Sequence, residues 1–302
     1  MTSITWQPRM RRLGRLLLVV LTFHLAPLAA QTSARAALFS ADLDLANTVF
    51  DSGLVATLPA ALGESGVLVW PGAAVLRGRD AVSRFLASQP LYASAHLLWQ
   101  PMHIDISRDS TLALMFGVAT VDVAGDSNFA GIHRIGRYVA AWQRTDGRWQ
   151  LAALAFVNVL RTGETIWRRV LGPAELPSLQ STGPARAFIA ADSAFAADAG
   201  ALGVSAAFGK WAAPDATTFS QTGELNVGPA RVAAVLASNK NHWEWGPVAA
   251  GASTDGTLGW TVGQATVTPP GDTPLKSKYL TLWRRMPDGT IRFVADGGNG
   301  RP

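Results

Sequence analysis

The hydrophobic positions near the start of the chain follow a helical period. Between residues 37 and 50, Leu38, Asp42, Leu45 and Val49 are spaced three or four residues apart, which predicts a helix. Gly53 interrupts that pattern, and residues 54–62 predict a second, short helix. A third helix is expected to open at Gly78, because the residues after it again place apolar side chains on one face.

The pattern then changes to the shorter period of β-strands. The predicted strands are residues 67–70, 97–106, 111–121, 134–144 and 149–159. Turn residues separate the last four strands, at Asp109-Ser110, Gly125-Asp126 and Asp146-Gly147. Helices followed by a run of strands predict an α+β fold, with an antiparallel sheet curled around about three helices.

The same order of patterns recurs about 150 residues later, so the chain is expected to contain two copies of one unit. Asp42 matches Asp192 at this offset, and the glycine pairs Gly53/Gly203 and Gly78/Gly228 keep the same register. Further matches at offsets of 146 and 141 residues, left by short deletions, are Trp99 with Trp245, Gly117 with Gly263, Tyr138 with Tyr279, and Trp142 with Trp283.

The copies predict two domains joined by a linker. The first copy spans residues 37–160, the glycine- and proline-rich linker 161–184, and the second copy 185–299. In the second copy the predicted helices are 185–199, 201–212 and 228–239, and the predicted strands are 216–221, 243–252, 257–268, 277–286 and 291–296. The closing run Gly297-Gly298-Asn299-Gly300 is expected to be a frayed tail.

The N-terminus predicts a secretory signal peptide over residues 1–30. Four arginines precede a short apolar run that ends in small residues at Ala29-Ala30. Cleavage after Ala30 would give a secreted or periplasmic protein with no membrane attachment. The alternative is an uncleaved anchor, although the apolar run is shorter than the roughly 20 residues of a spanning helix.

Charge and cysteine content narrow the functional classes further. Without residues 1–30 the chain has 22 basic residues (26 less the four arginines) against 21 acidic residues, which argues against a nucleic-acid partner. The chain has no cysteine, so disulfides and thiolate metal sites are excluded. The four histidines that remain form no cluster with acids in the sequence, and we expect no metal site and no cofactor.

In the second copy, Asp192, Gly203, Gly228, Gly263 and the run Tyr279–Arg285 resemble the nuclear transport factor 2-like superfamily, in its SnoaL-like and ketosteroid-isomerase-related branch. The first copy looks like a diverged member. The resemblance implies two tandem cone-shaped α+β barrel domains, each with a pocket in its mouth. It also implies pairing of the two repeats through their sheets, with the linker holding them together.

The resemblance further implies a general-base aspartate just after the first strand in members that act as isomerases. The equivalent positions here are Trp70 and Ser220, and neither side chain is acidic. Proton abstraction at that position is therefore not expected, and whether the chain is an enzyme stays open.

Other residues are candidates for a site. Asp296 and Tyr279 are the candidate catalytic residues, because Asp296 has no acidic counterpart in the first copy, where Leu154 takes its place. A mostly apolar pocket with a few polar anchors would be lined by Trp245, Trp260, Gln264, Trp283, Trp70, Trp99 and Tyr138. The same aromatic residues would serve equally in a core or between the copies. His103 and Asp105 share a face of one strand, as an acid–base pair or as two solvent-facing side chains.

Three hypotheses follow from these residues. The first is a secreted protein that binds a small, mostly apolar molecule. The second is an enzyme of the hydrolase, dehydratase or cyclase type that uses the second-copy pocket. The third is an assembly module whose interiors are filled by their own side chains.

Overall fold

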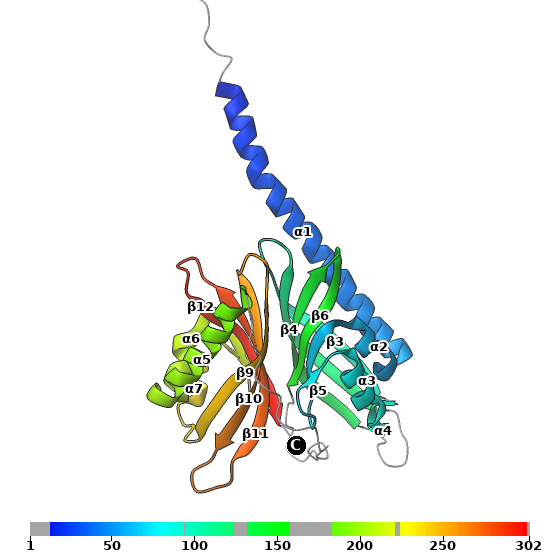
Figure 1. Cartoon of the computed structure of the whole chain (residues 1–302), viewed down its shortest axis with the longest axis vertical. Helices are drawn as coiled ribbons and strands as arrows, with labels where there is room; N and C mark the ends of the chain where they lie inside the picture. The colour runs from blue at the N-terminus through cyan, green and yellow to red at the C-terminus, as the bar shows by residue number, and fades with distance from the viewer. Residues whose placement is uncertain (1–12, 94, 124–131, 158–182, 221–223, 301–302) are drawn as a thin grey trace, which may run out of the picture.

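Two six-stranded sheets of the same strand order make up the body of the molecule (Figure 1). The computed structural model describes residues 13–93, 95–123, 132–157, 183–220 and 224–300. The sheet of the first copy has the order β2-β1-β6-β5-β4-β3, and the sheet of the second copy has the order β8-β7-β12-β11-β10-β9.

The elements of the first copy are α1 (Leu13–Ser52), α2 (Leu54–Ala61), β1 (Leu62–Val69), β2 (Leu76–Arg77), α3 (Arg79–Ala87), α4 (Pro90–Ala93), β3 (Ala95–Ile106), β4 (Leu112–Val123), β5 (Ile132–Thr145) and β6 (Arg148–Val157). Those of the second copy are α5 (Ala185–Leu202), α6 (Val204–Trp211), β7 (Ala212–Phe219), β8 (Leu225–Val227), α7 (Pro229–Leu236), β9 (His242–Ala252), β10 (Leu258–Thr268), β11 (Leu275–Arg285) and β12 (Ile291–Gly300). The predicted helix over residues 37–50 is the C-terminal part of α1. Within the described residues, no helix combines the length and the apolar character needed to cross a membrane.

Each sheet is mixed, which corrects the prediction of an antiparallel sheet. β1 pairs with β6 in parallel, and β7 pairs in the same way with β12. The last strand of each copy closes a meander and returns beside the first strand, running in the same direction. A parallel pair needs a long connection between its strands, and the helix and meander supply it.

Glycines at equivalent positions begin the short helices of both copies. Gly53 and Gly203 precede α2 and α6 with φ of 85° and 82°, and Gly78 and Gly228 precede α3 and α7 with φ of 76° and 83°. Side chains other than glycine are strained at such φ values. This shared backbone requirement explains why these glycines keep the register of the repeat.

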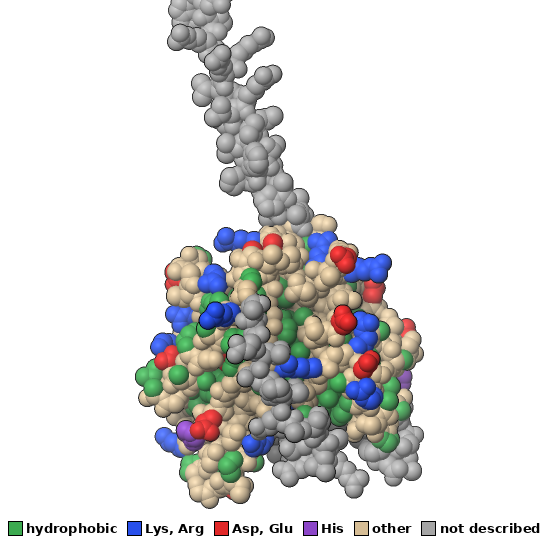
Figure 2. Space-filling view, in the orientation of Figure 1, with side chains coloured by type: hydrophobic (Ala, Val, Ile, Leu, Met, Phe, Trp, Pro, Cys, Tyr) green, Lys and Arg blue, Asp and Glu red, His purple; other side chains and the backbone are tan. Residues whose placement is uncertain are grey.

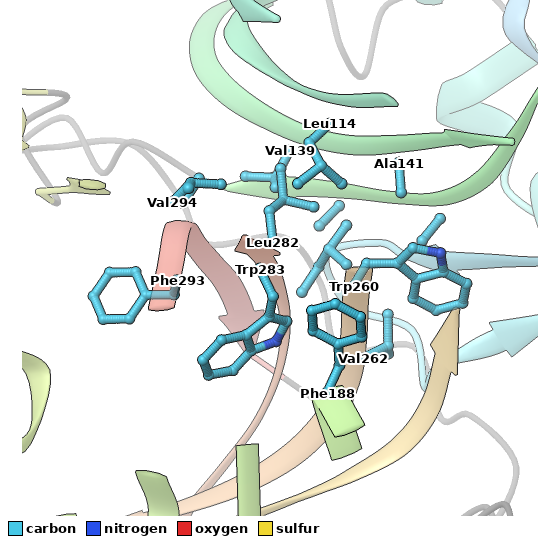
Figure 3. Packing of buried hydrophobic residues seen from close by; sticks show 14 of the residues in the cluster. Leu114, Val139, Ala141, Phe188, Trp260, Val262, Leu282, Trp283, Phe293 and Val294 are labelled. Carbon is cyan, nitrogen blue, oxygen red and sulfur yellow. The ribbon is translucent and has the colours of Figure 1, made fainter. Parts of the chain in front are cut away.

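Each sheet has one face covered by helices and one face turned toward the other sheet (Figure 1). We call these the helix-covered face and the inter-sheet face. In the first copy the helix-covered face holds one buried cluster that includes Leu38, Leu68, Met115, Tyr138 and Trp142. A second cluster crosses between the copies and joins Leu114, Val139 and Ala141 to Trp260, Val262 and Leu282 (Figure 3).

The two sheets also contact each other through polar groups arranged with approximate twofold symmetry. The Asp109 amide donates to Asp255 Oδ2 over 3.2 Å, and the Asp255 amide donates to Asp109 Oδ2 over 2.7 Å. Arg77 of β2 donates to the Val248 carbonyl of β9. On the face seen in Figure 2, acidic and basic side chains are interspersed over both copies.

The predicted frayed tail is instead the end of β12. Residues Gly297–Gly300 pair with Ser277–Leu280 of β11. Asn299 is 8% exposed, and its Nδ2 donates to the carbonyls of Val69 (3.2 Å) and Phe156 (2.6 Å) in the first copy. A glycine-rich strand suits this place because a Cβ on Gly297 would lie 2.5 Å from a methyl group of Val157.

Candidate functional site

A fully buried carboxylate lies on α5 against the helix-covered face of the second sheet. The indole nitrogen of Trp245 on β9 donates to Asp192 Oδ1 over 3.0 Å, and the hydroxyl of Tyr279 on β11 donates to Asp192 Oδ2 over 2.9 Å. Thr261 of β10 also hydrogen-bonds to this carboxyl. The repeat match between Asp42 and Asp192 therefore marks a buried polar position that each copy reaches from its long helix.

Burial changes the acidity of this group and its neighbour. Removal from water raises the pKa of Asp192 to about 6, against the lowering effect of hydrogen bonds from Thr261, Tyr279 and Trp245. Burial and the nearby Asp192 carboxylate both raise the pKa of Tyr279. The Tyr279 hydroxyl therefore stays protonated and acts as a donor at neutral pH.

A row of polar side chains crosses the second sheet beside Asp192. Five strands contribute one residue each, and neighbouring members are register partners, so their side chains share the helix-covered face. We call this set the polar row: Asn226 on β8, Thr218 on β7, Asp296 on β12, Thr281 on β11 and Thr261 on β10.

The equivalent row of the first copy is entirely apolar. Its members follow the same register across the sheet: Leu76 on β2, Leu68 on β1, Leu154 on β6, Ala140 on β5 and Met115 on β4. All five belong to the buried core of the first copy. The row is therefore polar in the second copy and apolar in the first, although the strand order is the same.

Asp296 is the titratable member of the polar row. It is partly exposed, whereas Leu154 at the equivalent position is only 5% exposed. Removal of the carboxyl from water raises the pKa of Asp296 to about 7, the Asp192 carboxylate adds to this effect, and a hydrogen bond with Thr281 opposes it. A carboxyl with such a pKa can give or accept a proton near neutral pH.

The two copies also differ next to Asp296. In the first copy Trp70 and Phe156 pack edge to face with ring centroids 4.6 Å apart, and Trp70 Nε1 donates to the Tyr92 hydroxyl over 2.6 Å. By register the positions of Trp70 and Phe156 are occupied in the second copy by Ser220 and Gly298, both partly exposed. Aromatic side chains close the first interior where the second has small residues.

The first interior keeps a small cavity lined by Asp42, Trp99, Tyr138, Ala140, Trp142, Leu151, Leu154 and Phe156. Its volume is about 10 Å³, room for about one water molecule. Trp99 Nε1 donates to Asp42 Oδ1 over 3.0 Å, but the buried Tyr138 hydroxyl and Trp142 Nε1 have no hydrogen-bond partner in the described part of the chain. Burial raises the pKa of Asp42 to about 6.

The candidate site residues fall into three groups in the structure. Asp296, Tyr279, Trp245 and Trp283 face the second interior, where Trp283 Nε1 donates to the Thr261 hydroxyl over 2.7 Å. The candidates Trp70, Trp99 and Tyr138 lie in the first interior.

Trp260 and Gln264 do not belong to either interior. Gly259 of β10 faces Phe188 of α5, so Trp260 and Gln264, at an odd number of residues from Gly259, point to the inter-sheet face. Figure 3 shows Trp260 in that layer, on the side of Ala141. A Cβ on Gly251 would lie 2.4 Å from Trp260 Nε1, so a glycine across from this indole makes room for it. Trp260 therefore joins the copies rather than lining a pocket.

The pair His103 and Asp105 connects the copies. His103 Nε2 lies 3.3 Å from Asp105 Oδ2, and its ring stacks on Phe116. Arg284 of β11 donates to Asp105, through Nε at 3.1 Å, and also to Asp215. Burial alone would raise the pKa of Asp105, but hydrogen bonds from His103 and Arg284 bring it below the ordinary value. Within the described part of the chain, no group of three His, Asp or Glu side chains is placed to hold a metal.

The sequence analysis named Asp296 as a candidate, but it did not name the other members of the polar row, Asn226, Thr218, Thr281 and Thr261. Threonine is common in strands, so these residues carry no signal when one copy is read alone. The usable signal is the comparison between copies, because each of the four is polar where the other copy has Leu76, Leu68, Ala140 or Met115.

A protein family and several solved structures are similar to parts of this chain. Residues 43–155 match the family model of the SnoaL-like domain. No curated protein sequence matches the chain. Among solved structures, an NTF2-like protein with a cystatin-like fold from Novosphingobium aromaticivorans is 18% identical, with a TM-score of 0.38, covering 46% of this chain and 90% of that chain.

Two further structures are similar to one copy at a time. An NTF2-like superfamily protein from Salmonella enterica is 12% identical, with a TM-score of 0.37, over 44% of this chain and 96% of that chain. A ketosteroid isomerase-like protein from Erwinia carotovora is 15% identical, with a TM-score of 0.33, over 41% of this chain and 95% of that chain. The region that matches the SnoaL-like domain therefore contains the first sheet, and the second sheet repeats the strand order of the first.

Proposed function

We propose that the second interior is an acid–base site that acts on a small, mostly apolar and uncharged molecule, in a reaction of the hydrolase, dehydratase or cyclase type. The observation that carries this proposal is the polar row of the second copy set against the apolar row of the first. The same fold is stable with five apolar side chains in that row, so the polar side chains are not a requirement of the fold.

Asp296 is the proton-transfer group in this proposal. With a pKa near 7 it is present in both protonation states at neutral pH, which suits a general acid or base. Tyr279 donates to Asp192, and the Asp192 carboxylate in turn raises the pKa of Asp296. Burial is the main cause of the raised pKa of Asp296, and the Asp192 carboxylate, to which Tyr279 donates, raises it further.

The apolar part of the ligand is assigned to the aromatic side chains next to the polar row. Phe195 on α5 packs against Trp245 and Trp283, with ring centroids 4.9 Å and 6.2 Å apart. Aromatic walls with a few polar anchors are typical of small-molecule sites. Two nearby carboxyl groups disfavour an anionic ligand, so an uncharged one is proposed.

This arrangement differs from isomerases in which an aspartate follows the first strand. Trp70 and Ser220 occupy that position here, and the proposed acid–base group is on the last strand instead. The proposed chemistry is therefore proton transfer from or to Asp296, with no role for an acid after the first strand.

We propose an assembly role for the first copy. Its interior is closed by Trp70, Tyr92 and Phe156, while its inter-sheet face packs against the second copy. In this view the first copy is the permanent partner that covers the inter-sheet face of the second. Binding without catalysis is the remaining candidate for the second interior, because its aromatic walls would hold an apolar ligand equally well.

We also propose that the protein is secreted or periplasmic, with the signal peptide removed after Ala30. The basic residues before the apolar run at residues 16–21 support this. Intact-mass measurement of the protein from the periplasm or medium would show a chain starting at Gln31. A full-length chain in the membrane fraction would contradict cleavage.

Native mass spectrometry of the protein from its own compartment, followed by turnover assays on any bound molecule, tests the function. Asp296→Asn is expected to keep the bound mass and to lower turnover at least 100-fold, whereas Asp51→Asn, an exposed control on α1, leaves both unchanged. Unchanged turnover in Asp296→Asn would overturn the acid–base role and leave binding. A protein with neither bound mass nor turnover would favour assembly alone.

A further inference from the structure

A buried amide in the second copy has an oxygen that no other described residue hydrogen-bonds. Asn226 of β8 is 2% exposed, and its Oδ1 has no hydrogen-bond partner among the residues that the structure describes. Buried polar side chains are normally paired, so an exception on a candidate site calls for an explanation. Asn226 is also a member of the polar row, which places its side chain on the helix-covered face.

The first copy shows that the fold itself does not need an amide here. Leu76 on β2 takes the equivalent place and packs in the core of the first copy. The strand β8, the positive φ of Gly228 and the start of α7 are the same as in the first copy, so the backbone gives no reason for asparagine. The difference between the copies is therefore chemical.

The register places Asn226 at a fixed distance from the proposed reacting group. Thr218 pairs with Asn226 on one side and with Asp296 on the other, so β7 alone separates β8 from β12. Neighbouring strands lie about 4.8 Å apart, which puts the backbones of Asn226 and Asp296 on the order of 10 Å apart. That span is about the length of a two-ring molecule.

We propose that Asn226 is a second anchor of the site and selects neutral ligands that carry a hydroxyl or N–H donor. This donor is separated from the ligand group that contacts Asp296 by about the length of a two-ring molecule. The donor binds Asn226 Oδ1, and the apolar frame crosses Thr218 toward Asp296. This inference rests on the proposed function for the location of the reacting group, but the donor preference is a property of binding alone. The proposed substrates are uncharged, mostly apolar molecules with a hydroxyl or N–H group at the end opposite the group that reacts with Asp296.

A pair of probes that differ only in the donor tests this proposal. 2-Naphthol has a two-ring frame with one hydroxyl, and 2-methoxynaphthalene has the same frame with that donor methylated. We expect the protein to bind 2-naphthol about 5- to 20-fold more tightly, measured by saturation-transfer NMR titration. Equal affinity for the two probes, or binding of neither, would overturn the proposal.

Two variants separate this proposal from the acid–base role. Asn226→Leu copies the residue of the first copy, is expected to fold, and should abolish the preference for 2-naphthol while leaving 2-methoxynaphthalene binding within about twofold. Asp296→Asn should keep the preference. A preference that survives in Asn226→Leu would overturn the anchor role. If Asp296→Asn keeps both the preference and full turnover, the acid–base proposal fails while the anchor stands.

Discussion

At the residue scale, the carboxyls of the second interior make stability depend on pH in a definite direction. The pKa of Asp296 in the folded protein is about 7, and that of Asp192 is about 6, both above the ordinary value of 3.8. Between pH 4 and 7 the folded chain therefore holds more protons than the unfolded chain. Linkage then requires the free energy of unfolding to fall as the pH rises through this range.

Asp296→Asn is expected to remove much of this dependence. The wild-type protein should lose on the order of 3 kcal/mol of unfolding free energy between pH 4.5 and 7.5 through Asp296. The variant should show a flatter profile in urea unfolding across that range, and the exposed control Asp51→Asn should keep the wild-type slope. Parallel profiles for wild type and Asp296→Asn would mean that Asp296 is solvated like an ordinary carboxyl.

The Thr261 hydroxyl is one difference between the polar networks of the two copies. In the second copy Thr261 accepts from Trp283 Nε1 and hydrogen-bonds to Asp192. In the first copy Met115 takes its place, and the buried Trp142 Nε1 has no hydrogen-bond partner within the described ranges. The orphaned donor follows from the absence of that hydroxyl.

Met115→Thr is therefore expected to be more stable than Met115→Val, its isosteric control. The threonine hydroxyl can accept from Trp142 and donate to Asp42, which favours it by about 1 kcal/mol over valine. Urea unfolding of the two variants gives the difference directly. A threonine variant less stable than the valine variant would show that the hydroxyl is buried without partners.

At the element scale, periodicity and glycines predicted most of the helices and strands. Gly53, Gly78 and Gly228 marked helix starts because their positive φ is a local requirement of the backbone, whereas the predicted helix 201–212 contained Gly203 and α6 begins only after it. The short strands β2 and β8 were missed, since two or three residues give no period. The glycine-rich end of β12 was read as a tail because its reason is tertiary, namely the close approach of Gly297 to Val157.

Dependence on tertiary structure also limited what the sequence could predict about the candidate site. Asp296 and Tyr279 stood out as single polar residues, and both face the second interior. Trp260 was assigned to a pocket because a tryptophan on a strand gives no indication of which face it occupies. That choice depends on the register with β9 and β11, which is set by the whole sheet.

Gly297→Ala tests the close contact at the end of β12. The added Cβ would lie 2.5 Å and 3.0 Å from methyl groups of Val157 and Val139 in the first copy. Overpacking of this kind is expected to lower the free energy of unfolding by about 1–3 kcal/mol. Gly200→Ala on α5 is the control, since its Cβ meets nothing within 4 Å, and it should be neutral or slightly stabilising. Equal effects of the two substitutions would contradict the tight packing.

At the scale of the whole molecule, contacts between the copies resemble those of a symmetric dimer within one chain. The turns of Asp109 and Asp255 exchange hydrogen bonds in both directions, at positions 146 residues apart. Other contacts are no longer symmetric. Asn299 donates to carbonyls of the first copy, whereas the equivalent residue of the first copy, Val157, has no side-chain donor. Because the two copies are parts of one chain, each side of the interface can change independently of the other. The interiors have diverged as well, since the polar row of the second copy is apolar in the first.

The ion pair of Arg284 with Asp105 is the last test of this interface. Both side chains are less than a quarter exposed, and the pKa of Asp105 lies below its ordinary value, so the pair stabilises the fold at neutral pH and less so as the pH falls below about 4. A double-mutant cycle with Arg284→Met and Asp105→Asn should give a coupling of about 1–2 kcal/mol at pH 7 that declines toward pH 3. The exposed pair Arg231 and Glu224, 3.9 Å apart, is the matched control and should couple by less than about 0.5 kcal/mol. A coupling between Arg284 and Asp105 no larger than that of the control would mean that this ion pair does not stabilise the contact between the two copies.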